Sequence, residues 1–422
     1  MPVLESQRWD CHGCTTCCRE LVVHLTPRDV REIDRQDWSG KIAGPPYLRL
    51  GRETVLSHVP GDGCVFLGDD GKCRIHTAFG AEAKPLACQV YPFTLQRQGA
   101  TLRAVLRFDC PSAAASRGSS LDAHSHQLAR LAEAFDTHAP AALGAAARAP
   151  RLVADRRLRP VEAEHLASRL DAWLRDAGRP LTDRLAGVAS FLDTLATARV
   201  DRLDEARLVE LIDLLASEVP ASAEAIVAAD HPPPDDRMRK LLRMTVFSYC
   251  EHVSLEQLRA PLGRRMAYRW SQLRRARRVA SGSGAIPSLA TGLADTTFDR
   301  LRPVGVAADA ADACEELATR YVRAKLLAGA CYGAAYYEWP FVDGVRALLV
   351  SLAAARWIAR YHAAADGRPS FTSDDFRRAI GLVDRAAGRA RELGKASARL
   401  RITYLARDRG IIRLLRAGDG VT

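Results

Sequence analysis

Eight of the eleven cysteines lie within the first 110 of 422 residues, and this concentration constrains the fold more than any other feature. Clustered thiols either form disulfides or bind a metal, and the redox compartment decides between the two. The other three, Cys250, Cys314 and Cys331, are scattered in helical patterns and are expected to be buried small hydrophobes. The clustered eight are Cys11, Cys14, Cys17, Cys18, Cys64, Cys73, Cys88 and Cys110.

The compartment expected from the sequence is the cytoplasm. The N-terminal residues 1–5 have neither the basic region nor the apolar region of a secretory signal. The longest apolar stretches, such as 347–355, are far shorter than the roughly 18 to 20 residues that cross a bilayer, so no membrane span is expected. Because cytoplasmic thiols stay reduced, the cysteine cluster favours metal binding over four disulfides.

The spacing of the thiols indicates a zinc site or an iron–sulfur cluster. Cys-x-x-Cys loops direct two soft, anionic sulfurs at one centre, and Cys11, Cys14, Cys17 and Cys18 supply four candidate ligands within eight residues. Adjacent Cys17 and Cys18 are awkward partners for one tetrahedral ion. Two four-thiolate sites, or one four-iron (4Fe-4S) cluster with additional cysteines, both fit the count. Position 21 is Leu, which excludes the Cys-x-x-x-Cys-x-x-Cys pattern of radical enzymes.

Residues 1–115 are predicted to form a small Cys-rich α+β module. Thr26, Pro27 and Asp29 have the N-cap, N1 and N3 pattern of a helix start. Two hairpins are expected, one from 64–67 and 73–76 around the turn 68–71, the other from 93–97 and 101–108 around Gln98-Gly99. The small, polar segment 112–120 is predicted to be a linker.

The remainder, 121–422, is predicted to be an irregular helical domain, which makes the fold class mainly α. Apolar residues recur at three- and four-residue spacing, and breaks at 231–235 and 281–303 leave open whether the domain is one unit or two. The predicted helices are 161–177, 183–197, 205–218, 236–258, 309–330, 344–363 and 373–393.

Four cysteine-bearing segments carry a family resemblance. They are Cys11-His12-Gly13-Cys14-Thr15-Thr16-Cys17-Cys18, Gly63-Cys64-Val65-Phe66-Leu67, Gly71-Lys72-Cys73-Arg74-Ile75-His76 and Lys84-Pro85-Leu86-Ala87-Cys88-Gln89-Val90-Tyr91-Pro92-Phe93. In this order they resemble the CxxCxxCC family of zinc- or iron-chelating proteins of the YkgJ/FliB type. Lys84, Gln89 and His76 stand where that family usually has Arg, Arg and Tyr. The departures leave all thiols in place.

The architecture is also similar to that of flagellin lysine N-methylases, which join such a module to a long helical region. The segments 321–327 and 341–349 carry this weaker part of the resemblance. It implies transfer of a methyl group from S-adenosylmethionine to lysine side chains of a flagellin-like protein substrate, assisted by an iron–sulfur centre. A non-enzymatic, metal-stabilised binding module and an iron–sulfur redox or metal-handling protein are the alternatives.

The net charge of +11 is poorly matched to a lysine-rich substrate. Residues 263–279 carry seven arginines and no acid, and we interpret them as a solvated helix, so a nucleic-acid partner is not favoured. The stretch Ser281-Gly282-Ser283-Gly284 lacks the preceding strand of a nucleotide-binding loop and is interpreted as a flexible break. The sequence does not predict the oligomeric state.

Overall fold

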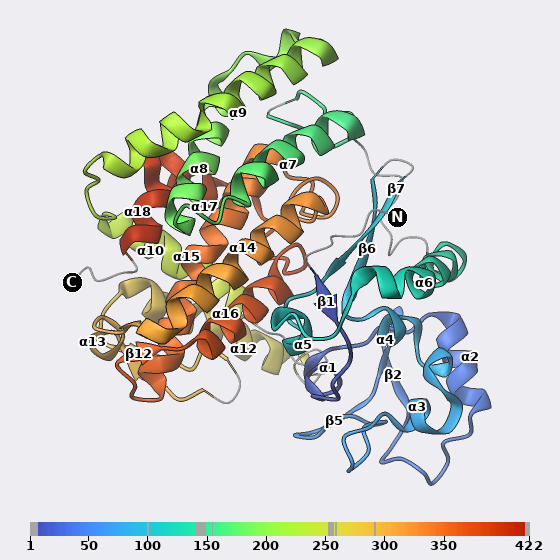
Figure 1. The fold of residues 1–422 in the computed structure, drawn as a ribbon. Helices are drawn as coiled ribbons and strands as arrows, with labels where there is room; N and C mark the ends of the chain where they lie inside the picture. The colour runs from blue at the N-terminus through green and yellow to red at the C-terminus, as the bar shows by residue number, and fades with distance from the viewer. Residues whose placement is uncertain are drawn as a thin grey trace. The chain divides into compact units, whose positions relative to one another are not determined.

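The computed structural model describes residues 7–98, 101–139, 149–153, 155–251, 257, 260–290 and 293–417. The chain is mainly helical, with short strands concentrated in its N-terminal part, as predicted (Figure 1). It divides into two compact units. Unit 1 contains residues 1–96, 102–145 and 252–271, and unit 2 contains 97–101, 146–251 and 272–422.

The first half of unit 1 consists of short elements around a small apolar cluster of Ile33, Trp38, Leu56, Val65, Phe66 and Ile75. Helix α2 begins where the sequence predicts, because Thr26 and Asp29 form a capping box and Pro27 occupies the first helical position. Strand β2 pairs with β3, and β4 with β5. The elements are β1 (Arg8–Trp9), α1 (Thr16–Glu20), α2 (Pro27–Arg35), β2 (Tyr47–Leu50), β3 (Glu53–Leu56), β4 (His58–Val59), β5 (Gly63–Cys64), α3 (Arg74–Phe79), η1 (Ala81–Ala83) and α4 (Leu86–Val90).

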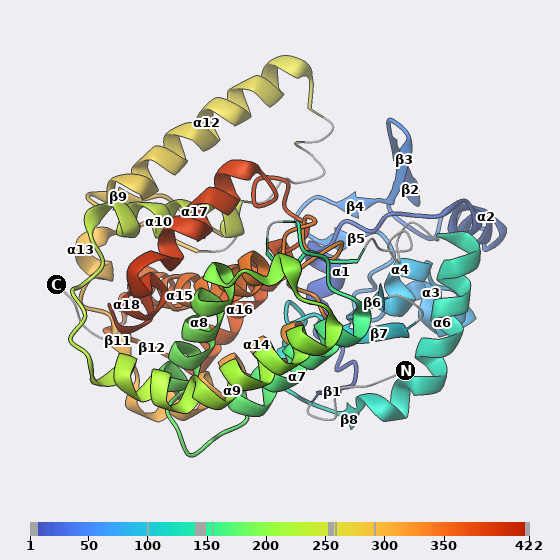
Figure 2. The same cartoon turned by 90° about the horizontal axis from the view of Figure 1, so that it is seen from above.

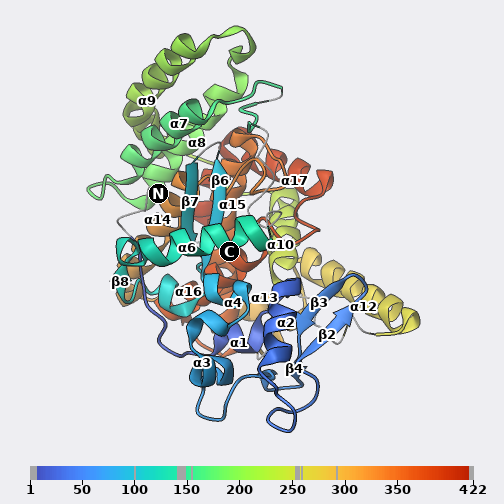
Figure 3. The same cartoon turned by 90° about the vertical axis from the view of Figure 1, so that its right-hand side faces the viewer.

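The second half of unit 1 is built on the predicted hairpin of β6 (Phe93–Gln98) and β7 (Thr101–Leu106), whose turn residue Gly99 lies outside the described residues. Helix α6 (Ser125–His138) packs on α4 (Figure 3). Its apolar face joins residues of the hairpin in a second cluster, which includes Phe93, Leu106, Leu128 and Phe135. The connecting elements are α5 (Pro111–Ala114), β8 (Ser119–Ser120) and η2 (Leu121–His124).

Two local predictions in unit 1 are wrong. Residues 73–76 do not continue a strand: Cys73 makes a single bridge to Leu67 and then caps α3. Residues 112–120 are not a linker, because β8 pairs with β1 and the side chains of Ser112, Ala113 and Ala114 are buried. Small residues pack closely against a core as readily as they form a tether.

Unit 2 is organised around α15 (Phe341–Ala365), which contacts α8, α10, α14, α16, α17 and α18 (Figure 2). Its residues 347–355 are almost entirely buried, as expected for a helix surrounded by others. The predicted helices all occur, with shifted ends, except that residues 252–256 and 258 of the predicted 236–258 helix lie outside the described residues. The other elements are α7 (Pro160–Leu174), α8 (Leu181–Thr197), η4 (Val200–Arg202), α9 (Glu205–Ala228), α10 (Asp236–Cys250), β9 (Ala285–Ile286), β10 (Thr296–Thr297), α13 (Phe298–Leu301), β11 (Gly305–Val306), η5 (Ala308–Ala310), α14 (Ala311–Leu327), β12 (Ser370–Phe371), α16 (Ser373–Ala386), α17 (Ala396–Ala406), η6 (Arg407–Arg409) and α18 (Gly410–Arg416). Helix α12 (Leu262–Ser281) begins in unit 1 and continues into unit 2 from residue 272.

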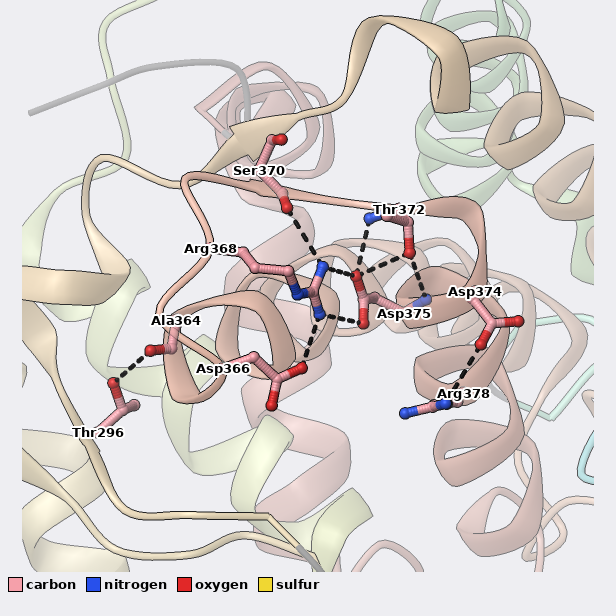
Figure 4. A network of polar contacts seen from close by, with 9 residues as sticks. All are labelled: Thr296, Ala364, Asp366, Arg368, Ser370, Thr372, Asp374, Asp375 and Arg378. Atoms are coloured by element: carbon pink, nitrogen blue, oxygen red, sulfur yellow. Dashed lines mark hydrogen bonds and ion pairs between the residues drawn. The ribbon is translucent and has the colours of Figure 1, made fainter.

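A polar network closes the turn between α15 and α16 (Figure 4). Arg368 donates to both carboxylate oxygens of buried Asp375, at 2.7 and 2.8 Å. Asp375 also accepts from the backbone and hydroxyl of Thr372, the N-cap of α16. A two-pronged arginine contact of this kind fixes both position and orientation, so the start of α16 is held firmly against the end of α15.

Candidate metal centre

All eight clustered cysteines are free thiols, and they differ in exposure. Cys11 and Cys14 are exposed, Cys110 is buried, and the other five are half-buried. Of the three scattered cysteines, Cys250 and Cys331 are buried as predicted, whereas Cys314 is half-buried. Within unit 1, Cys64, Cys73 and Cys88 pack against one apolar cluster and Cys110 belongs to the other, which defines two groups of thiols.

The first group contains Cys17, Cys64, Cys73 and Cys88. Cys64, Cys73 and Cys88 all pack against the cluster around Phe66. Cys17, Cys64 and Cys73 lie close enough to Cys88 to act on its pKa electrostatically. These thiols come from α1, β5, the start of α3 and α4, so four short elements direct sulfur atoms into one region.

Burial and neighbouring thiols raise the pKa values of Cys17, Cys64 and Cys88. Burial raises the pKa of Cys64 to about 11, with a smaller increase from Cys73 and Cys17, although the backbone N–H of Phe66 opposes the shift. Burial also raises the pKa of Cys88 far above its usual value, and nearby Lys84 only partly offsets this effect. The pKa of Cys17 is raised by its hydrogen bond with Cys18, at an Sγ–Sγ distance of 3.9 Å, and by burial. A bound divalent cation reverses such shifts by stabilising the thiolates.

Gly63 allows the Cys64 strand to approach the helix that carries Cys17. Its φ is +104°, and a Cβ atom placed there would lie 2.8 Å from both the Cα of Arg19 and the carbonyl oxygen of Cys18. Only glycine adopts this backbone conformation and this close approach without strain. The contact between β5 and α1 therefore depends on the absence of a side chain at position 63.

Asp29 holds the Cys88 helix in place. One carboxylate oxygen accepts from the backbone N–H of Leu86, the first residue of α4, at 3.0 Å, while the other accepts from Thr26 within the α2 capping box. Gln89 then donates to the carbonyl oxygen of Lys84 at 2.6 Å, which closes the loop before α4. The local sequence identifies Asp29 only as a capping residue, because its second role requires a contact 57 positions away.

The second group centres on Cys110. Burial raises the pKa of this thiol to about 11, while the backbone N–H groups of Ala113 and Ser112 oppose the shift, and Cys14 lies near enough to contribute. Nδ1 of His12 lies 3.1 Å from the Ser112 hydroxyl, which ties the first cysteine loop to α5. Cys14 and Cys110 are therefore neighbours, although 96 residues separate them.

The two groups of thiols have the donor chemistry of a metal site but are not arranged as a complete set of ligands. Among the described residues, no three histidine, cysteine or acidic side chains are positioned as a complete ligand set. Soft sulfur donors on short elements, with backbone N–H groups directed at Cys64 and Cys110, are nevertheless the surroundings that thiolate-bound zinc and iron–sulfur clusters require.

Comparison with known proteins agrees with this description of unit 1. Residues 10–110 match the family model CxxCxxCC, described as "Putative zinc- or iron-chelating domain", which confirms the resemblance found in the sequence. The match covers both cysteine groups and supports metal binding by this segment. No curated protein and no solved structure matches the chain. None of the helices described here is long and apolar enough to cross a membrane.

Proposed function

We propose that the thiols of Cys17, Cys64, Cys73 and Cys88 form the primary metal site of this protein, a zinc or iron–sulfur centre. The observation that carries the proposal is the convergence of these four thiols beside one apolar cluster, where Cys17 and Cys73 lie close enough to raise the pKa values of both Cys64 and Cys88. Cys18 lies beside this set, and Cys14 and Cys110 form the second group. Cys11, which the Cys-x-x-Cys spacing pairs with Cys14, would join them as a ligand of a second centre or as an alternative ligand of the first.

The bound metal would supply a cation that stabilises four thiolates and links four short elements. The chain's own residues orient these ligands: Asp29 positions α4, Gly63 brings β5 against α1, and the Phe66 N–H donates to the Cys64 sulfur. A zinc ion bound by four thiolates carries a net negative charge. Lys84 lies near Cys88 and would partly balance this charge.

Cysteine variants of the full-length protein, purified without oxygen, test the proposal. Cys64→Ser and Cys88→Ser should each lower metal content by more than about tenfold, because loss of a ligand costs at least as much as loss of an outer-shell partner. Cys250→Ser, a buried cysteine of unit 2, is the matched control and should keep its metal. Equal metal content in Cys64→Ser and Cys250→Ser would contradict the assignment.

The spectrum of the same samples identifies the metal. Iron with sulfide and a brown colour would indicate an iron–sulfur centre, while a colourless protein with zinc would indicate a structural site. If neither metal exceeds trace levels in reduced, chelator-free protein, the proposed centre is wrong.

Protein-lysine methylation with S-adenosylmethionine stays a prediction of the family resemblance. The two segments that extend this resemblance, 321–327 and 341–349, belong to α14 and α15, and Tyr321 and Phe341 are core residues with at most 1% exposure. They explain helix packing and provide no exposed site of their own. Binding of S-adenosylmethionine by the intact, metal-loaded protein would favour the enzyme, and no binding would favour the metal-stabilised binding module.

A further inference from the structure

A second candidate site lies wholly within unit 2, far in the sequence from the eight clustered cysteines. It is a pocket of about 720 Å³ bounded by α10, α12, α13, α15 and α18. These helices appear together in Figure 2, and α15 contacts α10, α13 and α18. The volume is within the range of roughly 300–1,000 Å³ that is typical of pockets for small ligands.

The lining of this pocket is strongly cationic. Helix α10 contributes Arg239, Lys240 and Arg243, and α15 contributes Arg356 and Arg360, which are one helical turn apart. Arg277 and Arg302 bring the number of basic side chains to seven, whereas Asp236 is the one acidic residue among the described residues that line the pocket. Asp236 is 99% exposed where it pairs with Arg239, so it weakly offsets the positive charge.

Main-chain carbonyl groups hold three of these arginines in place. Arg243 donates to Ala280 at the end of α12, Arg356 donates to Leu415 in the last turn of α18, and Arg360 donates to Leu301 and Arg302 at the end of α13. The C-terminal ends of helices attract cations, which explains why the guanidinium groups gather here. These contacts orient the arginines toward a common space before any ligand arrives, and such preorganisation lowers the cost of binding.

The Ser-Gly segment after α12 has a role in this arrangement. Gly282 has a φ of +79°, and a Cβ atom there would lie 2.6 Å from a terminal nitrogen of Arg243. The backbone of the segment therefore lies directly against the guanidinium group, and the glycine makes room for it. The segment interpreted from sequence as a flexible break positions a basic side chain of the pocket.

One wall of the pocket is aromatic and apolar. Half-buried Trp357 lies edge-to-face with Phe298 at 6.5 Å, and its other neighbour, Tyr361, is parallel to it at 6.2 Å. Leu242, Leu301 and Leu414 continue this surface. A ligand that matched both parts of the pocket would combine several negative charges with a flat ring.

We propose that this pocket binds a nucleoside diphosphate or triphosphate, with the phosphates among the arginines and the base against Trp357. Arginine recognises phosphate oxygens through paired, charge-assisted hydrogen bonds, and seven basic groups can engage two or three phosphates. A single-stranded nucleic acid would instead need an open groove lined with successive aromatic platforms. S-adenosylmethionine is a poor match because its sulfonium and ammonium groups are cationic.

Titration calorimetry on the full-length protein tests this proposal with ATP, tripolyphosphate, adenosine, S-adenosylmethionine and a short oligothymidylate. ATP should bind most tightly, tripolyphosphate several-fold more weakly, and adenosine and S-adenosylmethionine weakest. Arg277→Gln should weaken ATP and tripolyphosphate binding by roughly tenfold. Arg278→Gln is the matched control, because Arg278 is the next residue of α12, is also exposed, and does not line the pocket.

Trp357→Leu distinguishes the contribution of the base from that of the phosphates. It should weaken the binding of ATP but leave the binding of tripolyphosphate unchanged, since tripolyphosphate has no ring. Equal losses for Arg277→Gln and Arg278→Gln, or no saturable binding of ATP, would overturn the pocket assignment. Equal affinity for ATP and tripolyphosphate, or tighter binding of oligothymidylate than of ATP, would overturn the nucleotide assignment.

Discussion

Helices of the two units are held in very different ways. In unit 2, α15 buries 19 of its 25 residues against surrounding helices. In unit 1, α1 buries none of its five residues, and α3 and α4 bury one residue each, Ile75 and Leu86. Hydrophobic burial is the main source of helix stability in proteins, so helices of this size need another source of stability. We expect a metal bound by the cysteines on or beside α1, α3 and α4 to provide it.

Metal removal should therefore destabilise unit 1 but not unit 2, and this is the largest effect expected. Binding of a structural metal is worth on the order of 10 kcal/mol to a small domain, enough to decide whether the elements around the thiols fold. After chelation under reducing conditions, hydrogen exchange should show loss of protection for amides of α1, α3 and α4, while those of α15 remain protected. Unit 2 acts as the internal control. Unchanged protection of α4 in demetallated protein would mean that unit 1 folds on its apolar clusters alone.

Acid should destabilise unit 2 through His362 of α15. Neither ring nitrogen of this histidine has a hydrogen-bond partner among the described residues, and burial lowers its pKa to about 4. Asp375 and Asp366 oppose that shift, whereas Arg378 and Arg368 add to it. The unfolded chain binds the proton near pH 6.5 and the folded chain only near pH 4, so stability is complete above pH 6.5 and decreases as the pH falls toward 4.

The expected loss for unit 2 is roughly 3 kcal/mol over that interval, at about 1.4 kcal/mol per pH unit. Thermal unfolding followed between pH 7 and 4.5 measures this loss of stability. The pH range lies above that in which Asp375, whose pKa is lowered, titrates. His362→Leu should flatten the pH dependence. If the slope persists in His362→Leu, another group is responsible.

Local signals in the sequence were sufficient for much of the fold. The pattern Thr26-Pro27-Asp29 predicts the start of α2 because every contact of a capping box lies within four residues. The helices of unit 2 follow from apolar spacing, which is also local. The element at Cys73 was predicted wrongly because the sequence around the turn 68–71 is typical of a hairpin, whereas the structure forms only a single bridge between Leu67 and Cys73. The helix that follows Cys73 depends instead on packing of Ile75.

For the metal site and the arginine pocket, too, local sequence signals identify residues but not how they come together. The sequence identifies the eight thiols, but their division into two groups depends on contacts between residues as distant as Cys17 and Cys88, or Cys14 and Cys110. Arg356 and Arg360 are visibly one turn apart, yet no pattern indicates that α10 and α12 bring further arginines to the same pocket. Residue type and spacing are encoded locally, whereas convergence is decided by tertiary packing.

Glycine substitutions distinguish the local and long-range contributions within unit 1, and Gly61→Ala gives the smallest effect on stability. Gly61 and Gly63 both have positive φ values, +81° and +104°, and lie two residues apart before Cys64. A Cβ atom at position 61 would meet no atom within 4 Å, whereas one at 63 would collide with the backbone of α1. Gly61→Ala should therefore cost about 1 kcal/mol for the left-handed conformation alone.

Gly63→Ala should add a cost of roughly 1–3 kcal/mol, because β5 must move away from α1 to relieve the collision. That movement separates Cys64 from Cys17, so Gly63→Ala should also lose metal, while Gly61→Ala should retain it. Metal content and the denaturation midpoint of the two variants, measured side by side, check both parts. If both variants hold the same amount of metal, the close approach of β5 to α1 contributes only to folding, and Cys17 is not a ligand in the same centre as Cys64.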